Sequence, residues 1–335
     1  MASDTPANRA PLEEDRGLVF AVILNGKGGG TQVGWDEIRA WRPEAGALWY
    51  HVNVNSEHVT SWILGRGGLT EPTASAMLSR ESRPRVFHGS KGFVAILRGI
   101  NLNPGRDIED MVSLHMWSDG LKLISVRQEK LRTTRDIYEE TIAGAGPGTI
   151  PDLFVTLIAR LTDRIGLVVV DYDDKLDELE EMIETADSSE LRRDLGDLRQ
   201  ELVGIRRFIA PQREALNRLL QDPPQWLDEH HLLQLREIGD RSQRHLEEID
   251  AARERALVLK DDVANRLNET MNRNMYVVSI VAAIFLPLSF VTGLLGINVG
   301  GMPGVEDGEA FWLTCAALVF LLGVEIAIFR WLRWL

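Results

Sequence analysis

Two long apolar runs dominate the C-terminal part of the chain. Residues 276–295, YVVSIVAAIFLPLSFVTGLL, contain no charged side chain, and residues 311–329 contain only one, Glu325. Twenty helical residues span about 30 Å, which matches the hydrocarbon thickness of a bilayer. The pattern therefore predicts two transmembrane helices, at 276–295 and 311–329, joined by a short loop at 296–310.

Charges on either side of the two runs predict their orientation. The loop carries only acidic side chains, whereas arginines flank both membrane-spanning segments on the other side. Because basic residues favour the cytoplasmic side, we expect cytoplasmic termini, including a basic end at 330–335, and a periplasmic loop whose acids attract cations. The acids are Glu306, Asp307 and Glu309, and the flanking arginines are Arg266, Arg273, Arg330 and Arg333.

The first part of the chain follows a different pattern. Between residues 18 and 127, short runs such as LVFAVIL, ALWYHVNV and GFVAILRGI have the length and composition of strands, with Gly, Pro, Asn and Asp between them. Several connections are too short for repeated helical crossovers. We therefore expect a cytoplasmic α/β domain at 17–150 with a mixed or mostly antiparallel sheet, after a disordered tail at 1–16.

Helical periodicity begins near Arg132. It predicts cytoplasmic helices at 151–222, with Thr149 or Asp152 as a cap, and a stalk helix at 223–275 that starts at a cap on Asp222 and continues into the first membrane span. A broken apolar stripe on the stalk predicts packing against copies of the same helix. Its members are Leu235, Ile238, Leu246, Ile249, Ala256, Val263, Leu267 and Met271.

Charge and cysteine content narrow the classes of function. The formal net charge of the 335 residues is -13, from 50 acidic and 37 basic side chains. This balance argues against a protein that binds nucleic acid and suits one that attracts cations. The single cysteine, Cys315, excludes a disulfide within the chain and a cysteine-rich zinc site.

Motifs for enzymes, nucleotides and tightly bound metals are absent from the sequence. The glycine-rich stretch at 25–32, NGKGGGTQ, departs from the phosphate-loop pattern and predicts a tight turn between strands. The seven histidines form no zinc motif, so only His230 and His231 remain as weak metal candidates. We expect neither an enzyme nor a resident cofactor.

Glu325 leaves two interpretations open. An ionisable residue inside a membrane span is usually functional, which favours proton coupling or contact with an ion. However, Arg330 follows five residues later, so Glu325 could instead lie near the inner headgroups and pair with that arginine or with a neighbour.

The segment FLPLSFVTGLLGIN, its short outer loop and the basic end FRWLRWL resemble the CorA-type divalent metal ion transporters. That superfamily carries Gly-Met-Asn at the outer mouth, and here the selectivity motif reads Gly296, Ile297 and Asn298. The isoleucine and the following VGGMPG resemble the zinc transport branch, the ZntB-like proteins. ESRPRVF, VRQEKL and APQRE are also similar to that branch, so the resemblance covers nearly the whole chain.

The resemblance implies a funnel-shaped homopentamer. Each copy would have an α+β cytoplasmic domain, an all-α stalk and two transmembrane helices, the first of which lines a pore. Matching this helix residue by residue to the family places a line of side chains along the pore, and their spacing independently follows one helical face. From the outer mouth inward these are Asn298, Ser289, Leu286, Val278, Met275, Asn272 and, below them, Asp261.

The chemistry of this line favours a hydrated divalent cation. Asn298, Ser289 and Asn272 offer neutral oxygens that can accept hydrogen bonds from the waters around an ion, and apolar collars between them can gate by dewetting. The line contains none of the His and Cys ligands that Zn2+ prefers, so binding would be weak enough for release. Zinc therefore rests on the branch-specific motif.

The leading hypothesis is zinc transport through a homopentamer in the bacterial inner membrane, without nucleotide or nucleic acid. One alternative is a magnesium, cobalt or nickel channel of the same superfamily, and another, of a different class, is a membrane-anchored metal sensor. The direction of transport and any proton coupling stay open at this level.

Overall fold

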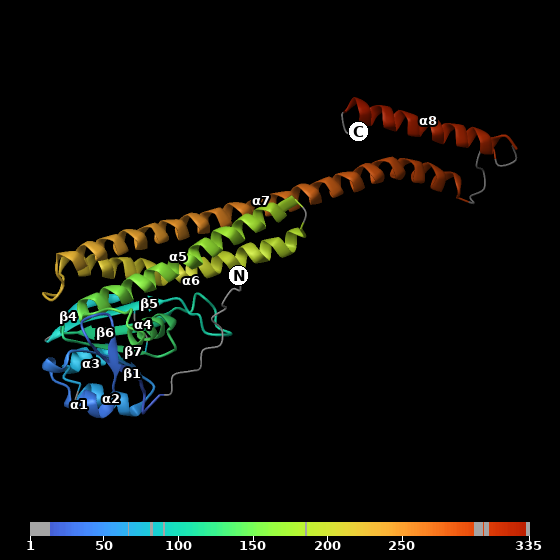
Figure 1. Ribbon diagram of the computed structural model, residues 1–335. Helices are drawn as coiled ribbons and strands as arrows, with labels where there is room; N and C mark the ends of the chain where they lie inside the picture. Colours follow the sequence, from blue (N-terminus) through green and yellow to red (C-terminus); the bar gives the residue numbers. More distant parts are fainter. Residues whose placement is uncertain are drawn as a thin grey trace, which may run out of the picture. The chain divides into compact units, whose positions relative to one another are not determined.

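The computed structural model describes residues 14–65, 67–80, 83–89, 91–184, 186–297, 304 and 308–332. The chain forms two compact units, which divide between Lys260 and Asp261. One long helix, α7 (Glu229–Leu295), belongs to both of them (Figure 1). Each unit is therefore described separately.

A seven-stranded sheet forms the centre of the first unit, in the order β2-β1-β3-β7-β6-β5-β4. All neighbouring strands are antiparallel except β3 and β7, which are parallel. The predicted mixed and mostly antiparallel sheet is thus confirmed. The strands are β1 (Leu18–Leu24), β2 (Gly30–Gln32), β3 (Ala47–Asn53), β4 (Arg85–Gly89), β5 (Gly92–Gly99), β6 (Val112–Ser118) and β7 (Lys122–Arg127).

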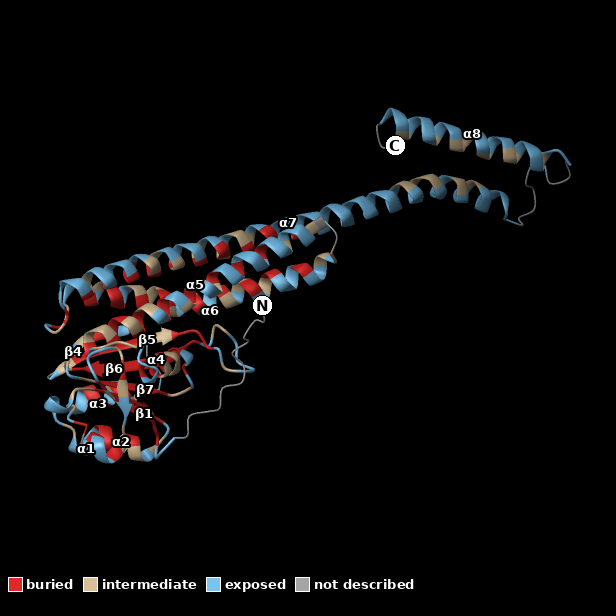
Figure 2. Ribbon diagram, viewed as in Figure 1, coloured by how far each residue is buried: buried red, intermediate tan, exposed pale blue. Residues whose placement is uncertain are grey.

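Both faces of the sheet are covered, because successive side chains of a strand point to opposite faces. In β5, Phe93, Ala95 and Leu97 belong to one apolar core, while Val94 and Ile96 belong to the other. This explains why the central strands read as nearly continuous apolar runs. Figure 2 shows the strands as mostly buried.

Short helices cover one face of the sheet. They are α1 (Trp35–Ala40), α2 (Glu57–Gly65) and α3 (Glu71–Leu78), and a 3-10 turn at Pro43–Ala45 follows the first of them. Their buried aromatic and apolar side chains, among them Trp35 and Met77, close this second core.

Long helices cover the opposite face. They are α4 (Arg132–Ile142), α5 (Ile150–Glu181), α6 (Ser188–Gln221) and the first part of α7, with a 3-10 turn at Met182–Glu184 (Figure 1). As predicted, Thr149 caps α5, because its hydroxyl accepts a hydrogen bond from the Asp152 amide at 3.2 Å.

The start of α7 and the use of its apolar stripe differ from the prediction. Asp222 ends α6, whereas the carboxylate of Asp228 accepts the His231 amide at 3.0 Å and so caps α7. The stripe side chains from Leu235 to Val263 are buried within the same chain. They therefore pack against the chain's own core, where α5 and α6 lie, whereas Leu267 and Met271, the last two members of the predicted stripe, are exposed.

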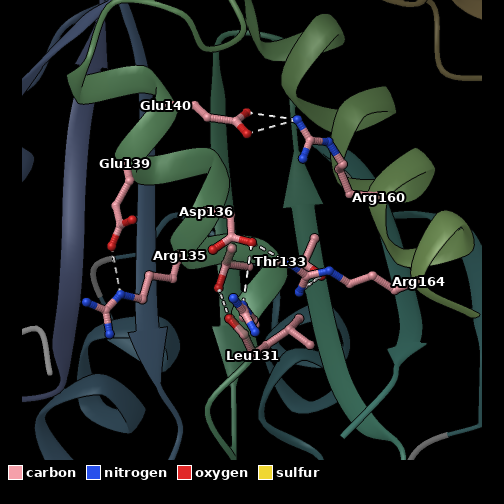
Figure 3. A network of polar contacts seen from close by, with 10 residues as sticks. Leu131, Thr133, Arg135, Asp136, Glu139, Glu140, Arg160 and Arg164 are labelled. Carbon is pink, nitrogen blue, oxygen red and sulfur yellow. Dashed lines mark hydrogen bonds and ion pairs between the residues drawn. The ribbon is translucent and has the colours of Figure 1, made fainter. Parts of the chain in front are cut away.

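Ion pairs attach α7 to the helices beside it. Arg241 lies 3.1 Å from Asp163 of α5, and further along the same two helices Arg255 lies 2.6 Å from Asp177. A comparable network joins α4 to α5 (Figure 3). Arg164 of α5 contacts both Asp136 and Thr133 of α4, and the Arg160 guanidinium donates to both carboxylate oxygens of Glu140. The partners come from three helices, α4, α5 and α7, so these contacts hold the helices of this layer to one another.

Two N-terminal features also follow from local chemistry. The glycine-rich stretch forms the predicted turn between β1 and β2, and Asn25 stabilises it by accepting the amides of Lys27 and Gly29 at 2.8 and 3.0 Å. Glu14 pairs with the nearly buried Arg127 at 2.6 Å. Most of the predicted tail, residues 1–13, lies outside the described part.

Acid is expected to destabilise the first unit through His115. Burial lowers the pKa of His115 to about 4 from its ordinary value of 6.5, although its Nδ1 donates to the Met77 carbonyl at 3.0 Å. Below pH 6.5 the unfolded chain binds a proton that the folded chain does not, so the free energy of unfolding falls as the pH drops toward 4. One such group contributes a slope of up to about 1.4 kcal/mol per pH unit.

Denaturation of the full-length protein in detergent, followed by tryptophan fluorescence at several pH values, measures this slope. His115→Gln is expected to flatten it, because an amide does not titrate. An unchanged slope in this variant would contradict the assignment to His115.

The second unit contains the rest of α7 and α8 (Ala310–Trp331). Both helices are long and apolar enough to cross a membrane, and the apolar window of each is entirely unburied. Figure 2 shows both as exposed along most of their length. Exposure of so much apolar surface to water is unfavourable, and it is expected for a helix that is surrounded by lipid or by other helices.

Candidate functional site

The predicted line of side chains lies along one face of α7. Successive residues of a helix are rotated by about 100°, so Asn272, Met275, Val278, Leu286 and Ser289 fall within about one third of the circumference. Asp261 at the start of the second unit falls within the same arc. The helix is continuous through Pro287, so the face is not interrupted.

Every described member of this line is exposed in the single chain. The exposed fractions of Met275, Val278 and Leu286 are 62%, 68% and 75%, and Asn272 and Ser289 are also exposed. The face therefore presents apolar side chains with amide and hydroxyl groups between and beyond them. None of the residues that the structure describes covers this face.

Two further side chains of the same arc lie between Val278 and Leu286. They are Ser279 and Ala282, and both are exposed. The Ser279 hydroxyl donates to the Met275 carbonyl at 2.8 Å, so its oxygen keeps a free acceptor side. The three-and-four spacing is the signal that identifies both positions.

The outer end of α7 is held by a local turn. The helix ends at Leu295, and the Gly296 amide donates to the Thr292 carbonyl at 2.9 Å, after which Ile297 is exposed. Of the predicted residues beyond this point, Glu309 is exposed just before α8. Asn298, Glu306 and Asp307 lie outside the described residues, as does the end of the chain from residue 333.

The two candidate metal histidines have other partners. The imidazole of His231 is largely buried between Asp152, 3.2 Å from its Nε2, and Asp228, 2.6 Å from its Nδ1. His230 contacts Gln234 at 3.2 Å. The His231 amide and imidazole lower the pKa of Asp228. No group of three or more His, Cys, Asp or Glu suited to a metal occurs among the residues with described positions.

The comparisons with known proteins agree along almost the whole chain. A family model described as "CorA-like Mg2+ transporter protein" matches residues 44–331. The "Divalent cation transporter CmaX" of Pseudomonas aeruginosa is 38% identical over 326 residues, covering 96% of this chain and 98% of that protein. The "Zinc transport protein ZntB" of Yersinia enterocolitica is 30% identical over 323 residues, covering 96% and 97%.

Solved structures show the same fold. Full-length CmaX gives a TM-score of 0.83 at 36% identity and covers 96% of this chain and 99% of its own. The CorA magnesium transporter from Methanocaldococcus jannaschii gives 0.79 at 16% identity, with 92% and 97% covered, and so supports the fold alone. The soluble α/β unit, the long helix, the two apolar helices and these matches show that the chain belongs to the CorA-like Mg2+ transporter family, whose members are membrane transporters and not enzymes.

Proposed function

We propose that five copies of the chain form a pore that conducts divalent cations, lined by the exposed face of α7. The observation that carries this proposal is the uncovered line from Asn272 to Ser289 in a membrane-spanning helix. Polar groups facing lipid would lose their hydrogen bonds, whereas five such faces around an axis would present them to water and ions. Two spans per chain cannot enclose such a path alone, so an oligomer is required.

The proposed path treats the ion as a hydrated one. Amide and hydroxyl oxygens of Asn298, Ser289 and Asn272 would accept hydrogen bonds from its waters, and apolar collars at Leu286 and Val278 would interrupt the water column when the pore is closed. Because neutral oxygens bind the ion weakly, it can leave again. The acids at Glu306, Asp307 and Glu309 would raise the local cation concentration at the outer mouth.

We propose Zn2+ as the transported ion, with the periplasmic loop outside and both termini in the cytoplasm of a bacterium. The support is the Gly296-Ile297-Asn298 motif and the relative named as a zinc transport protein. A magnesium, cobalt or nickel channel is the second candidate. The family model described for Mg2+ and the relative named as a divalent cation transporter favour it.

Flux into liposomes distinguishes these candidates. The full-length protein is reconstituted with a zinc-sensitive or a magnesium-sensitive dye inside, and empty liposomes measure leakage. Zinc flux above leakage, and reduced only weakly by competing Mg2+, would support zinc. Large magnesium flux with zinc flux at the level of leakage would assign the protein to the second candidate. Imposed pH gradients in the same assay test direction and proton coupling.

Leu286→Ser is expected to raise basal cation flux severalfold, because a hydroxyl in place of an isobutyl group lets water wet the proposed collar. Val281→Ser is the matched control, since Val281 is also an exposed apolar residue of the same span but lies outside the arc. Equal basal flux in the two variants would place the gate away from Leu286.

A further inference from the structure

Glu325 is the one acidic side chain of α8, whose other charged residue is Arg330 near its cytoplasmic end. It lies six residues before Trp331, which is about 9 Å along the helix axis. A glutamate side chain is too short to cover that distance. The carboxyl group therefore lies within the apolar part of the helix and not at its end.

The immediate surroundings of this carboxyl group are unusual. Both of its oxygens are buried, and neither has a hydrogen-bond partner among the residues that the structure describes. Arg330 lies five positions further, so it points about 140° away around the helix axis. It is exposed and forms no ion pair with Glu325. The expected pairing of these two residues is thus absent.

An ionised carboxylate in this position would be costly. Lipid and apolar side chains cannot replace the water that solvates a charge, and a buried charge without a partner is rare in membrane proteins. A carboxylic acid avoids most of this cost because it is neutral. It still carries one donor and can share its proton when a partner or water reaches it.

We propose that Glu325 is an intramembrane proton-binding site that carries its proton when the protein is folded in the membrane at neutral pH. This requires only that α8 spans the bilayer and is independent of which metal the protein carries. Among the described residues, the charged or titratable groups near the inner end of the two spans are Arg330 on α8 and Arg273 and Tyr276 on α7. Arg273 is exposed and has no ion pair with a described residue, so a second copy could offer it to an ionised Glu325.

A lipid-soluble carbodiimide tests the proposal directly, because it reacts with neutral carboxylic acids in apolar surroundings. The full-length protein in liposomes is treated with dicyclohexylcarbodiimide near neutral pH and analysed by peptide mass spectrometry. We expect an adduct on Glu325 that diminishes as the pH is raised and is lost in Glu325→Gln. A water-soluble carbodiimide should label the exposed Glu309 and leave Glu325 unmodified.

Two variants test whether Glu325 is neutral without depending on whether the carbodiimide reaches it. If Glu325 is neutral, Glu325→Gln keeps the melting temperature of the detergent-solubilised assembly, because an amide replaces an uncharged acid of the same shape. If Glu325 is ionised and paired with Arg273 of another copy, Glu325→Gln and Arg273→Gln both lower it. Recovery in the exchanged pair Glu325→Arg with Arg273→Glu would overturn the proposal.

Discussion

Asn298→Ala is expected to reduce cation flux to nearly that of empty liposomes. Under the proposed assembly this substitution removes five amide groups at once from the narrow outer mouth. A hydrated cation would then lose the hydrogen-bond acceptors that replace bulk water at entry, while the apolar methyl groups offer none. Loss of about 1 kcal/mol per hydrogen bond, repeated around a ring, suppresses entry by several orders of magnitude.

Asn274→Ala is the control for this experiment. Asn274 is an exposed asparagine of the same helix that lies outside the arc, so its loss should leave the flux unchanged. Retained flux in Asn298→Ala, with both variants assembled equally well, would contradict the role of the amide. Equal loss in both variants would indicate damage to the helix and not to the mouth.

His51→Leu is expected to lower the free energy of unfolding of the first unit by about 2 to 4 kcal/mol. His51 is fully buried, and its two ring nitrogens lie 2.9 Å from the Ser125 hydroxyl and 3.3 Å from the Thr134 hydroxyl. Thr134 donates onward to the Leu131 carbonyl, so it accepts from Nε2, and Nδ1 accepts from Ser125. Leucine provides neither group.

Denaturation of the full-length protein in detergent measures the loss. His230→Leu is the control, because His230 is exposed and its described side-chain contacts, with Gln234 and His231, lie within its own helix. Burial holds the pKa of His51 well below its usual range, and the charge of Arg127 lowers it further. His51 is therefore a neutral side chain that links the Ser125 and Thr134 hydroxyls by hydrogen bonds. A His51→Leu variant as stable as the wild type would contradict that role.

Features that depend on local pattern were predictable from the sequence. The strands follow from short apolar runs between turn residues, and the single helix through stalk and membrane follows from the absence of glycine and proline over most of its length. The arc on α7 follows from the match to the family's pore helix, and helical spacing supports it independently. In each case, neighbours within a few positions determine the outcome.

Features that depend on distant contacts were not predictable. The His51 and Ser125 side chains are separated by 74 positions in the sequence, and no motif marks them as partners. The apolar stripe of the stalk suits contact with a copy or with its own chain equally well, and only the positions of α5 and α6 decide between these. The unpaired state of Glu325 likewise depends on the direction of its side chain.

Continuity of α7 has a mechanical consequence. Between Gly239 and Pro287 the helix contains neither glycine nor proline, so its hydrogen-bonded backbone has no intrinsically weak point over this length. In the first unit, ion pairs hold α7 to its neighbours. Arg241 and Arg255 of α7 contact carboxylates of α5, and Arg206 of α6 contacts a carboxylate of α7. A small rotation of α7 about its axis in the first unit would therefore be transmitted to the membrane-spanning part of the helix. Bending of the helix would concentrate at Pro287, which is next to Leu286.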